Sequence, residues 1–181
     1  MASNVGKKFE EDIKKSIPDY CLTIRIPDPP QSFTKRSDTR FSVKNPFDFI
    51  VFDSKAGVLY CFELKTTKYK SMSFEDINSD EEQNKMIHKH QIIWLLKCSN
   101  YDNVKPGFIF NFRDEKNDEQ RTYFQDVVSF NDMCNKIDKS SFNELDLLTN
   151  NAIKISGNKK RTRYFWNIDE FLKSQHGEVL I

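Results

Sequence analysis

Apolar residues recur along the chain in two spacings, one typical of helices and one typical of strands. Every fourth residue from Val5 to Ile17 is apolar, which predicts a helix that ends at about Ser16, just ahead of a proline. The run from Cys21 to Ile26 is rich in aliphatic and β-branched residues and predicts a strand. Prolines follow directly, and we expect the polar stretch 27–45 to form a projecting basic arm.

The most informative part of the pattern is a pair of apolar runs, 45–52 and 58–65, joined by a turn that contains Gly57. Such a pair predicts a hairpin of two buried strands. Downstream, the spacing predicts a helix at 80–97, strands at 106–112 and 122–124, helices at 129–137 and 142–148, and, within 150–181, a strand pair at 152–155 and 163–166 followed by a helix at 168–173. This order predicts an α/β fold with a mixed central β-sheet flanked by helices.

Both strands of the predicted hairpin carry an acid among apolar neighbours, Asp48 in the first and Glu63 in the second. Burying an unpartnered carboxylate is costly, so a matched pair needs a physical reason. A divalent cation between the two acids supplies one, because Mg²⁺ takes oxygen ligands from one or two carboxylates and from substrate phosphate. Lys65 lies two residues after Glu63, so both side chains project to the same face of the strand, where the ammonium group can orient a water or neutralise a phosphate.

A simpler interpretation stays open for this pattern. Short acid-x-lysine matches are common, and a surface hairpin with one Asp turn and one Glu–Lys pair would show the same residues. The apolar residues on both sides of the acids favour the buried, metal-binding interpretation.

Composition sets the size and class of the protein. The 181 residues, 38% of them hydrophobic, predict a single domain 1–181 with a substantial core. The net charge of +1 does not indicate a nucleic-acid-binding protein, but the charge is unevenly distributed. Five basic residues and two acids lie in 25–44, and five basic residues and no acid lie in 154–163, as expected if one face meets phosphate. Ordinary solvent-exposed charge is the alternative.

The cysteines and the absence of long apolar runs indicate a compartment. Cys21, Cys61, Cys98 and Cys134 are widely separated and form no C-x-x-C pair, so we do not expect zinc. No apolar run is long enough to span a membrane and no apolar leader is visible, so we expect no membrane partner. These features predict a cytoplasmic protein with reduced cysteines.

Four stretches of the chain resemble, in the same order, the RecU-type Holliday-junction resolvases of the PD-(D/E)-x-K nuclease superfamily. They are Gly6-Lys7-Lys8-Phe9-Glu10-Glu11-Asp12-Ile13; Pro46-Phe47-Asp48 with Phe62-Glu63-Leu64-Lys65-Thr66-Thr67; Ser73-Phe74 with Ile87-His88-Lys89-His90-Gln91-Ile92; and Pro106-Gly107-Phe108-Ile109-Phe110-Asn111-Phe112 with Tyr123-Phe124. The resemblance covers most of the length at low identity and implies a restriction-endonuclease-like core. The chain departs from the family in its shorter arm and in Phe47, where the family often has Thr.

The resemblance implies a structure-selective DNA endonuclease that cleaves four-way junctions in recombination and repair. It would use Mg²⁺, for which Mn²⁺ would substitute, and would act as a homodimer without a nucleotide cofactor. The implied site consists of Asp48, Glu63 and the Leu64 carbonyl as metal ligands, Glu10 holding waters on the metal, Lys65 orienting the attacking water, and Gln91 supporting the site. Branched DNA would be bound by Lys35, Arg36, Arg40, Lys44, Lys68, Lys70, His88, Lys159, Lys160, Arg161 and Arg163.

Alternatives remain at each level. On the same fold, a restriction-type or repair-type nuclease and a non-catalytic DNA-binding protein are the rival functions. Gln91 could instead be a polar residue at the edge of a helix stripe, and the lysines after the hairpin a solvated turn. The complete set of two acids and one lysine favours an enzyme.

Overall fold

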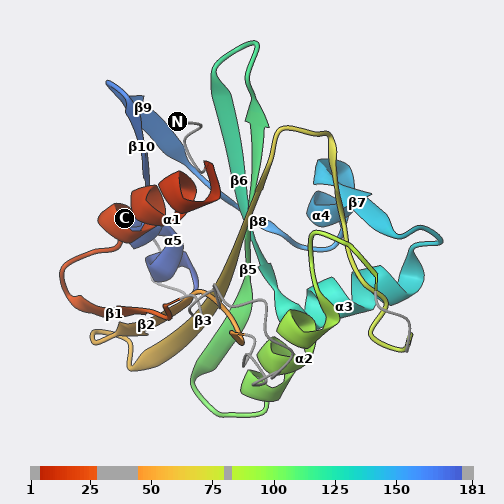
Figure 1. Cartoon of the computed structure of the whole chain (residues 1–181). Coiled ribbons are helices and arrows are strands. Elements are labelled where there is room, and N and C mark those ends of the chain that lie inside the picture. The colour runs from red at the N-terminus through yellow and green to blue at the C-terminus, as the bar shows by residue number, and fades with distance from the viewer. Residues whose placement is uncertain (1–4, 28–44, 80–82, 177–181) are drawn as a thin grey trace, which may run out of the picture.

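The computed structural model describes residues 5–27, 45–79 and 83–176, and its centre is a six-stranded β-sheet (Figure 1). In their order across the sheet, the strands are β1 (Cys21–Arg25), β2 (Phe49–Asp53), β3 (Val58–Thr67), β5 (Val104–Asp114), β6 (Glu119–Asp126) and β8 (Ile153–Ile155). Strands β3 and β5 pair in parallel, whereas the other neighbours in this sheet pair antiparallel. The predicted α/β class, with a mixed central sheet flanked by helices, is confirmed.

The predicted hairpin is formed by β2 and β3. Gly57 lies in its turn with a φ of 67°, a left-handed conformation that glycine adopts without strain. The register pairs Phe49 with Phe62 and Val51 with Tyr60, and all four side chains belong to one buried cluster. Cross-strand packing of aromatic and β-branched residues therefore holds the hairpin together.

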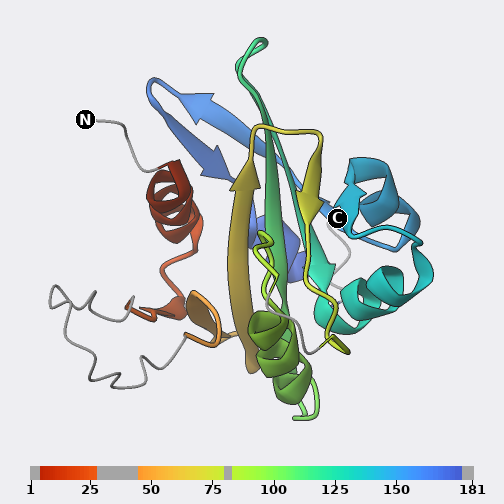
Figure 2. The same ribbon diagram turned by 45° about the vertical axis from the view of Figure 1, so that its right-hand side comes forward.

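Each face of the central sheet packs against its own set of helices (Figure 2). Helices α1 (Val5–Ser16) and α5 (Ile168–Ser174) cover one face, and α2 (Lys89–Cys98), α3 (Val127–Lys136) and α4 (Glu144–Thr149) cover the other. Two hydrophobic cores result, separated by the sheet.

Strand β3 divides its side chains between the two cores, and this alternation places the candidate acid. Phe62 and Leu64 belong to the core against α1, whereas Cys61 belongs to the core against α2. Glu63 and Lys65 follow Cys61 in steps of two residues. They therefore project to the face that α2 covers.

Two small sheets lie outside the central one, and the second of them corrects a prediction. In the first, β4 (Ser71–Ser73) pairs with β7 (Ser141–Asn143), and in the second β9 (Gly157–Lys160) pairs with β10 (Arg163–Trp166). The predicted pairing of 152–155 with 163–166 is wrong, because β8 joins β6 instead. Strand β10 pairs instead with β9, to which it is joined by a tight turn with Arg161 at a φ of 56°. Closing this short loop costs less chain entropy than closing the longer loop back to β8.

Helix α2 is shorter than predicted. The sequence predicts a helix at 80–97, but among the described residues it begins at Lys89, with His88 as its N-cap. Ile87 continues an extended segment that bridges to Phe74, and its side chain is fully buried in the core. The free energy gained by burying the Ile87 side chain outweighs the helix propensity of the residues predicted to begin the helix.

Several predicted features lie outside the described residues. They are most of the arm at 27–45, including Lys35, Arg36, Arg40 and Lys44, and residues 80–82 of the predicted helix. Within the described ranges, no helix has both the length and the apolar character needed to cross a membrane.

Gly107 provides a test of the packing between β5 and β6. A carbon added there would lie 2.5 Å from the carbonyl oxygen of Gln125 and 2.5 Å from Cε2 of Phe124. Since one of these atoms is backbone, we expect Gly107→Ala to lower the free energy of unfolding by about 1–3 kcal/mol in a urea titration. Gly57→Asn, at a turn with nothing within 4 Å of the added carbon, should cost less than about 1 kcal/mol. An equal loss for both variants would contradict this packing.

Candidate active site

Asp48 lies directly before β2 and is fixed against β3 by two hydrogen bonds. Its backbone N–H donates to the Phe62 carbonyl at 3.0 Å, and its Oδ2 accepts from the Leu64 N–H at 2.8 Å. These bonds extend the hairpin pairing by one residue. The Asp48 carboxylate is thereby held beside the part of β3 that carries Glu63.

Glu63 is the most deeply buried acid of the site, with 3% of its surface exposed. Lys65 approaches it along the same face of β3, and the lysine Nζ lies 2.9 Å from Glu63 Oε1. Only 16% of the lysine side chain is exposed. The two-residue period of the strand therefore builds the predicted acid–lysine pair inside the protein.

Gln91 reaches Glu63 from the first turn of α2. Its Nε2 donates a short hydrogen bond to Glu63 Oε1, and its own Oε1 accepts from the His88 N–H at 3.1 Å. Because both ends of the amide are engaged, its orientation is fixed. Gln91 is buried and binds Glu63, so it is not the polar edge residue that the alternative interpretation describes.

Glu10 approaches from α1. Its Oε2 lies 2.7 Å from both Nε and Nη2 of Arg25 on β1. The negative charge of Glu10 is close enough to contribute to the raised pKa of both Asp48 and Glu63. The structure thus brings together the five predicted catalytic residues, Glu10, Asp48, Glu63, Lys65 and Gln91, and adds Arg25, which sequence reasoning missed.

The two central carboxyl groups are harder to ionise than ordinary acids. Burial is the main cause that raises the pKa of Glu63 to about 7, with Lys65 opposing the rise and the charge of Asp48 adding to it. Burial likewise raises the pKa of Asp48 to about 6, against the hydrogen bond from the Leu64 N–H. A nearby cation would stabilise both ionised forms.

The contacts of the two carboxylates suit a hard divalent cation. Among the described residues, the hydrogen bonds and the ion pair engage Oε1 of Glu63 and Oδ2 of Asp48. The other oxygens, Oε2 of Glu63 and Oδ1 of Asp48, are therefore available to coordinate a cation. The described ranges contain no group of three or more His, Cys, Asp and Glu side chains placed to hold a metal. Two carboxylates nevertheless fit Mg²⁺, which keeps several waters and binds substrate phosphate.

Glu75 supports the site indirectly, through the first turn of α2, and was not identified from the sequence. Its Oε2 accepts from the Lys89 N–H at 2.7 Å, and its Oε1 lies 2.9 Å from Nδ1 of His88. Since the backbone of His88 also holds the Gln91 amide, Glu75 steadies the helix turn that directs Gln91 to Glu63. Glu75 lies 14 residues before Lys89, so no local spacing links it to this helix.

The predicted DNA-binding residues within the described ranges fall into two groups. The exposed group lies on the β3–β4 turn and on the β9–β10 hairpin, and its members are Lys68, Lys70, Lys159, Lys160 and Arg161. Lys159 of this group pairs with Asp118. The other two predicted residues also pair with acids. His88 pairs with Glu75, and Arg163 pairs with Glu11 at 2.9 Å and with Asp12 at 3.0 Å.

Replacing Glu63 by Gln tests whether its buried charge is costly. Because its pKa is raised, the folded protein binds a proton more tightly than the unfolded chain, and stability falls as pH rises from about 4.5 to about 7. We expect Glu63→Gln to remove most of this fall. At pH 8 it should raise the free energy of unfolding of the metal-free protein by about 1–3 kcal/mol in a urea titration.

Glu144→Gln is the matched control. Burial alone would raise the pKa of Glu144, but hydrogen bonds from Arg121 and Tyr123 hold it below its usual range. This carboxylate is stabilised by its partners, so its replacement should lower the free energy of unfolding at pH 8 by about 1–2 kcal/mol. Destabilisation by both substitutions would show that Glu63 is an ordinary ion-pair partner.

Glu75→Ala tests the anchoring of α2. Loss of the carboxylate removes an anionic partner from the N-terminal end of the helix, so we expect the free energy of unfolding to fall by about 1–2 kcal/mol. Hydrogen exchange of the Lys89 amide should accelerate. Glu115→Ala, on the exposed β5–β6 turn, should change stability by less than about 0.5 kcal/mol. Unchanged exchange in α2 would mean that Glu75 does not hold the helix.

Comparison with known proteins places the chain in a family. No protein-family model matches it. It is 31% identical over 179 residues to the SPbeta prophage-derived uncharacterized protein YotM of Bacillus subtilis (strain 168), and the alignment covers 93% of this chain and 85% of YotM. Identity at this level over nearly the whole chain shows common descent, and the chain therefore belongs to the same family as YotM.

Proposed function

We propose that the protein is a Mg²⁺-dependent, structure-selective DNA endonuclease of the PD-(D/E)-x-K type, similar to the RecU-type resolvases. It would cleave four-way junctions during DNA recombination and repair in the cytoplasm. The observation that carries the proposal is that half-buried Asp48, directly before β2, lies beside the part of β3 that carries buried Glu63 and half-buried Lys65. A structural ion pair needs one acid and one lysine, whereas a second acid beside them gains a role when a cation binds between the two acids.

The residues of the site have separate tasks in phosphodiester hydrolysis. A Mg²⁺ ion held by Asp48, Glu63 and the Leu64 carbonyl would act as a Lewis acid toward the scissile phosphate and lower the pKa of a water. Lys65 places its positive charge beside Glu63, where it would orient the attacking water and offset the negative charge that develops on the phosphate.

Gln91 and Glu10 position these groups. Gln91 binds Oε1 of Glu63, which limits rotation of the carboxylate and leaves Oε2 for the cation. Glu10, held by Arg25, keeps a carboxylate at the rim of the site, where it would accept hydrogen bonds from waters. Both contacts exist in the protein alone, so little rearrangement would be needed when DNA binds.

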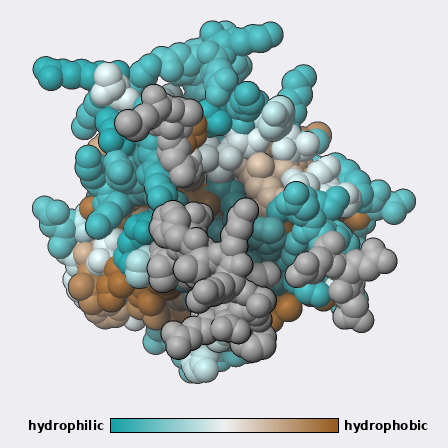
Figure 3. All heavy atoms as spheres, in the orientation of Figure 1, coloured by the Kyte–Doolittle hydropathy of each residue, from teal (hydrophilic) through white to brown (hydrophobic). Residues whose placement is uncertain are grey.

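A homodimer would supply two active sites for symmetric cleavage across a junction. The edge strand β1 offers an apolar surface for such an assembly, because Leu22 and Ile24 are 61% and 49% exposed. In Figure 3 a hydrophobic area lies at the lower left, over β1 and β2. Exposed apolar side chains on an edge strand favour pairing with another chain.

Cleavage of defined substrates tests the proposal. Purified protein is incubated with a labelled four-way junction, a flap and a linear duplex, in Mg²⁺, Mn²⁺ or EDTA. We expect the junction to be cut with either metal and left intact in EDTA. Sequence-dependent cutting of the linear duplex would indicate a restriction-type or repair-type nuclease instead. Binding without cleavage of any substrate would indicate a non-catalytic DNA-binding protein.

Variants of the site sharpen this test. Asp48→Asn and Lys65→Ala should each reduce the cleavage rate by a factor of about 10²–10³ or more while junction affinity stays within about threefold, because one side chain is a small part of the phosphate-binding surface. Lys116→Ala removes an exposed lysine from the β5–β6 turn and should leave the rate unchanged. Cleavage by Asp48→Asn at close to the wild-type rate would refute the assignment.

A further inference from the structure

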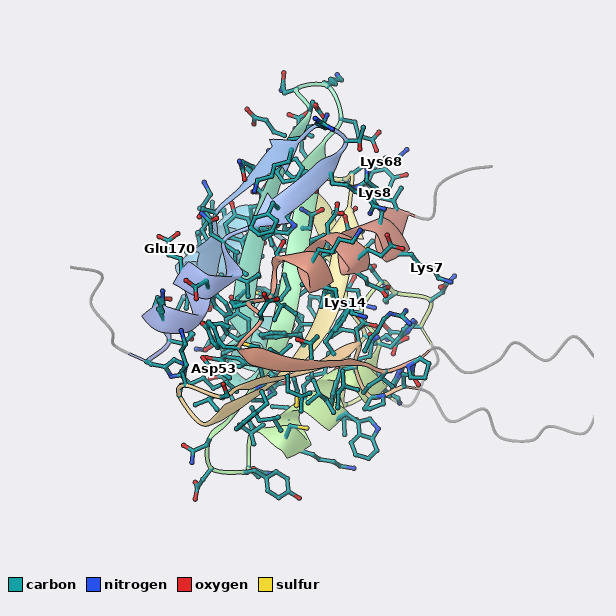
Figure 4. All side chains as sticks on the ribbon, turned by 90° about the vertical axis from the view of Figure 1, so that its left-hand side faces the viewer. Lys7, Lys8, Lys14, Asp53, Lys68 and Glu170 are labelled. Carbon is teal, nitrogen blue, oxygen red and sulfur yellow. The ribbon has the colours of Figure 1, made fainter. Side chains whose placement is uncertain are left out.

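Lys7 and Lys14 lie on the same face of α1 as Glu10. Residues three and four positions apart share a helix face, and these are the spacings from Glu10 back to Lys7 and forward to Lys14. All three line a pocket of about 280 Å³ together with Arg25. Because Glu10 and Arg25 belong to the candidate active site, both lysines border that site. Figure 4 shows them toward the two ends of the helix.

The acids of α1 pair with arginines from other elements, and the lysines of the helix lie on the exposed surface. Glu10 pairs with Arg25, and Glu11 and Asp12 pair with Arg163. The exposed lysines of the helix are Lys7, Lys8, Lys14 and Lys15. Two arginines from distant parts of the chain therefore offset the acids, and the surface that α1 presents to solvent is positively charged.

The spacing of the two lysines suits the backbone of a DNA strand. At a rise of about 1.5 Å per residue, Lys7 lies about 4.5 Å and Lys14 about 6 Å along the helix axis from Glu10. The two lysines are thus about 10 Å apart along that axis. Phosphates of one strand advance by about 3.4 Å along the duplex axis and are further apart along the winding backbone, so two lysines about 10 Å apart can reach different phosphates that are no more than three steps apart.

The site also needs cations on electrostatic grounds. Glu10, Asp48 and Glu63 place three carboxyl groups close together, against two cationic partners, Arg25 and Lys65, and when ionised they repel a phosphate backbone. A divalent metal between two of the acids would offset the charge at the scissile phosphate. The neighbouring phosphates would still need partners, and the lysines on either side of Glu10 are placed to supply them.

We propose that Lys7 and Lys14 form a phosphate-binding pair that holds the DNA backbone on either side of the scissile phosphate. This inference rests on the proposed nuclease function and adds the surface that places the strand. The contacts are to backbone phosphates, so they contribute affinity and register without reading base sequence. They therefore act on junctions and on linear duplex alike.

Binding measured as a function of salt tests the pair. The parent protein is the Asp48→Asn variant, which leaves DNA uncleaved. The double substitution Lys7→Gln/Lys14→Gln is made in this parent, and binding of labelled junction and labelled duplex in Mg²⁺ is measured by fluorescence anisotropy. We expect affinity to fall about tenfold for both substrates. The slope of log K against log salt should become shallower by about 1 to 2, as the loss of one or two phosphate contacts requires.

Lys116→Gln/Lys136→Gln is the matched control, with the same change of net charge at two exposed lysines away from α1. It should change affinity by less than twofold and leave the slope unchanged. Thermal melting checks that both double variants fold. If the α1 variant melts early, Lys7→Arg/Lys14→Arg keeps the charge and should bind DNA as the parent does.

The outcomes separate this inference from the function on which it rests. If the parent binds and the wild-type protein cleaves DNA, but the α1 variant weakens binding no more than the control, the phosphate-binding pair is refuted and the nuclease function stands. If the parent binds neither substrate at any salt concentration, both are refuted. Loss of binding to phosphatidylserine vesicles without loss of DNA binding would overturn the pair in favour of a membrane contact.

Discussion

The burial of two carboxylates beside each other is the constraint on which the rest of the site depends. Asp48 lies directly before β2 and Glu63 lies on the adjoining strand β3, and burial raises the pKa of both toward neutrality. Such a pair is unfavourable alone, so its neighbours are arranged to offset the charge and to fix the oxygens. Lys65 supplies a cation at 2.9 Å and Gln91 supplies a hydrogen-bond donor. Lys65 offsets one of the two negative charges, and a divalent metal between the acids would offset the other.

Strand β3 links this constraint to the stability of the fold. It pairs antiparallel with β2 and parallel with β5, and its side chains enter both hydrophobic cores. Phe62 and Leu64 anchor it against α1, which leaves Glu63 and Lys65 on the opposite face. A shift of the register by one residue would exchange these faces and bury the lysine among aromatic rings. The packing of the core and the geometry of the site therefore select the same register.

The two helices beside the site serve it in different ways. Helix α2 contributes Gln91, and Glu75 holds the first turn from which that amide extends. Helix α1 contributes Glu10 and carries exposed lysines on either side of it. One helix therefore stabilises a buried polar group, while the other combines a site acid with a positive surface. This division is consistent with a metal centre on one side of the strand pair and a bound polyanion along its rim.

The chain by itself determined the features that depend on local spacing. The alternation of β3 was sufficient to predict the hairpin and the acid–lysine pair on one face, because a strand repeats every two residues. Tertiary structure alone decided that α2 begins after Ile87, which is buried beside Phe74, and that β10 pairs with β9. It also decided that Arg25 and Glu75 support the site. These outcomes depend on burial and on hydrogen-bond partners brought together from separate parts of the chain, and no local spacing carries that information.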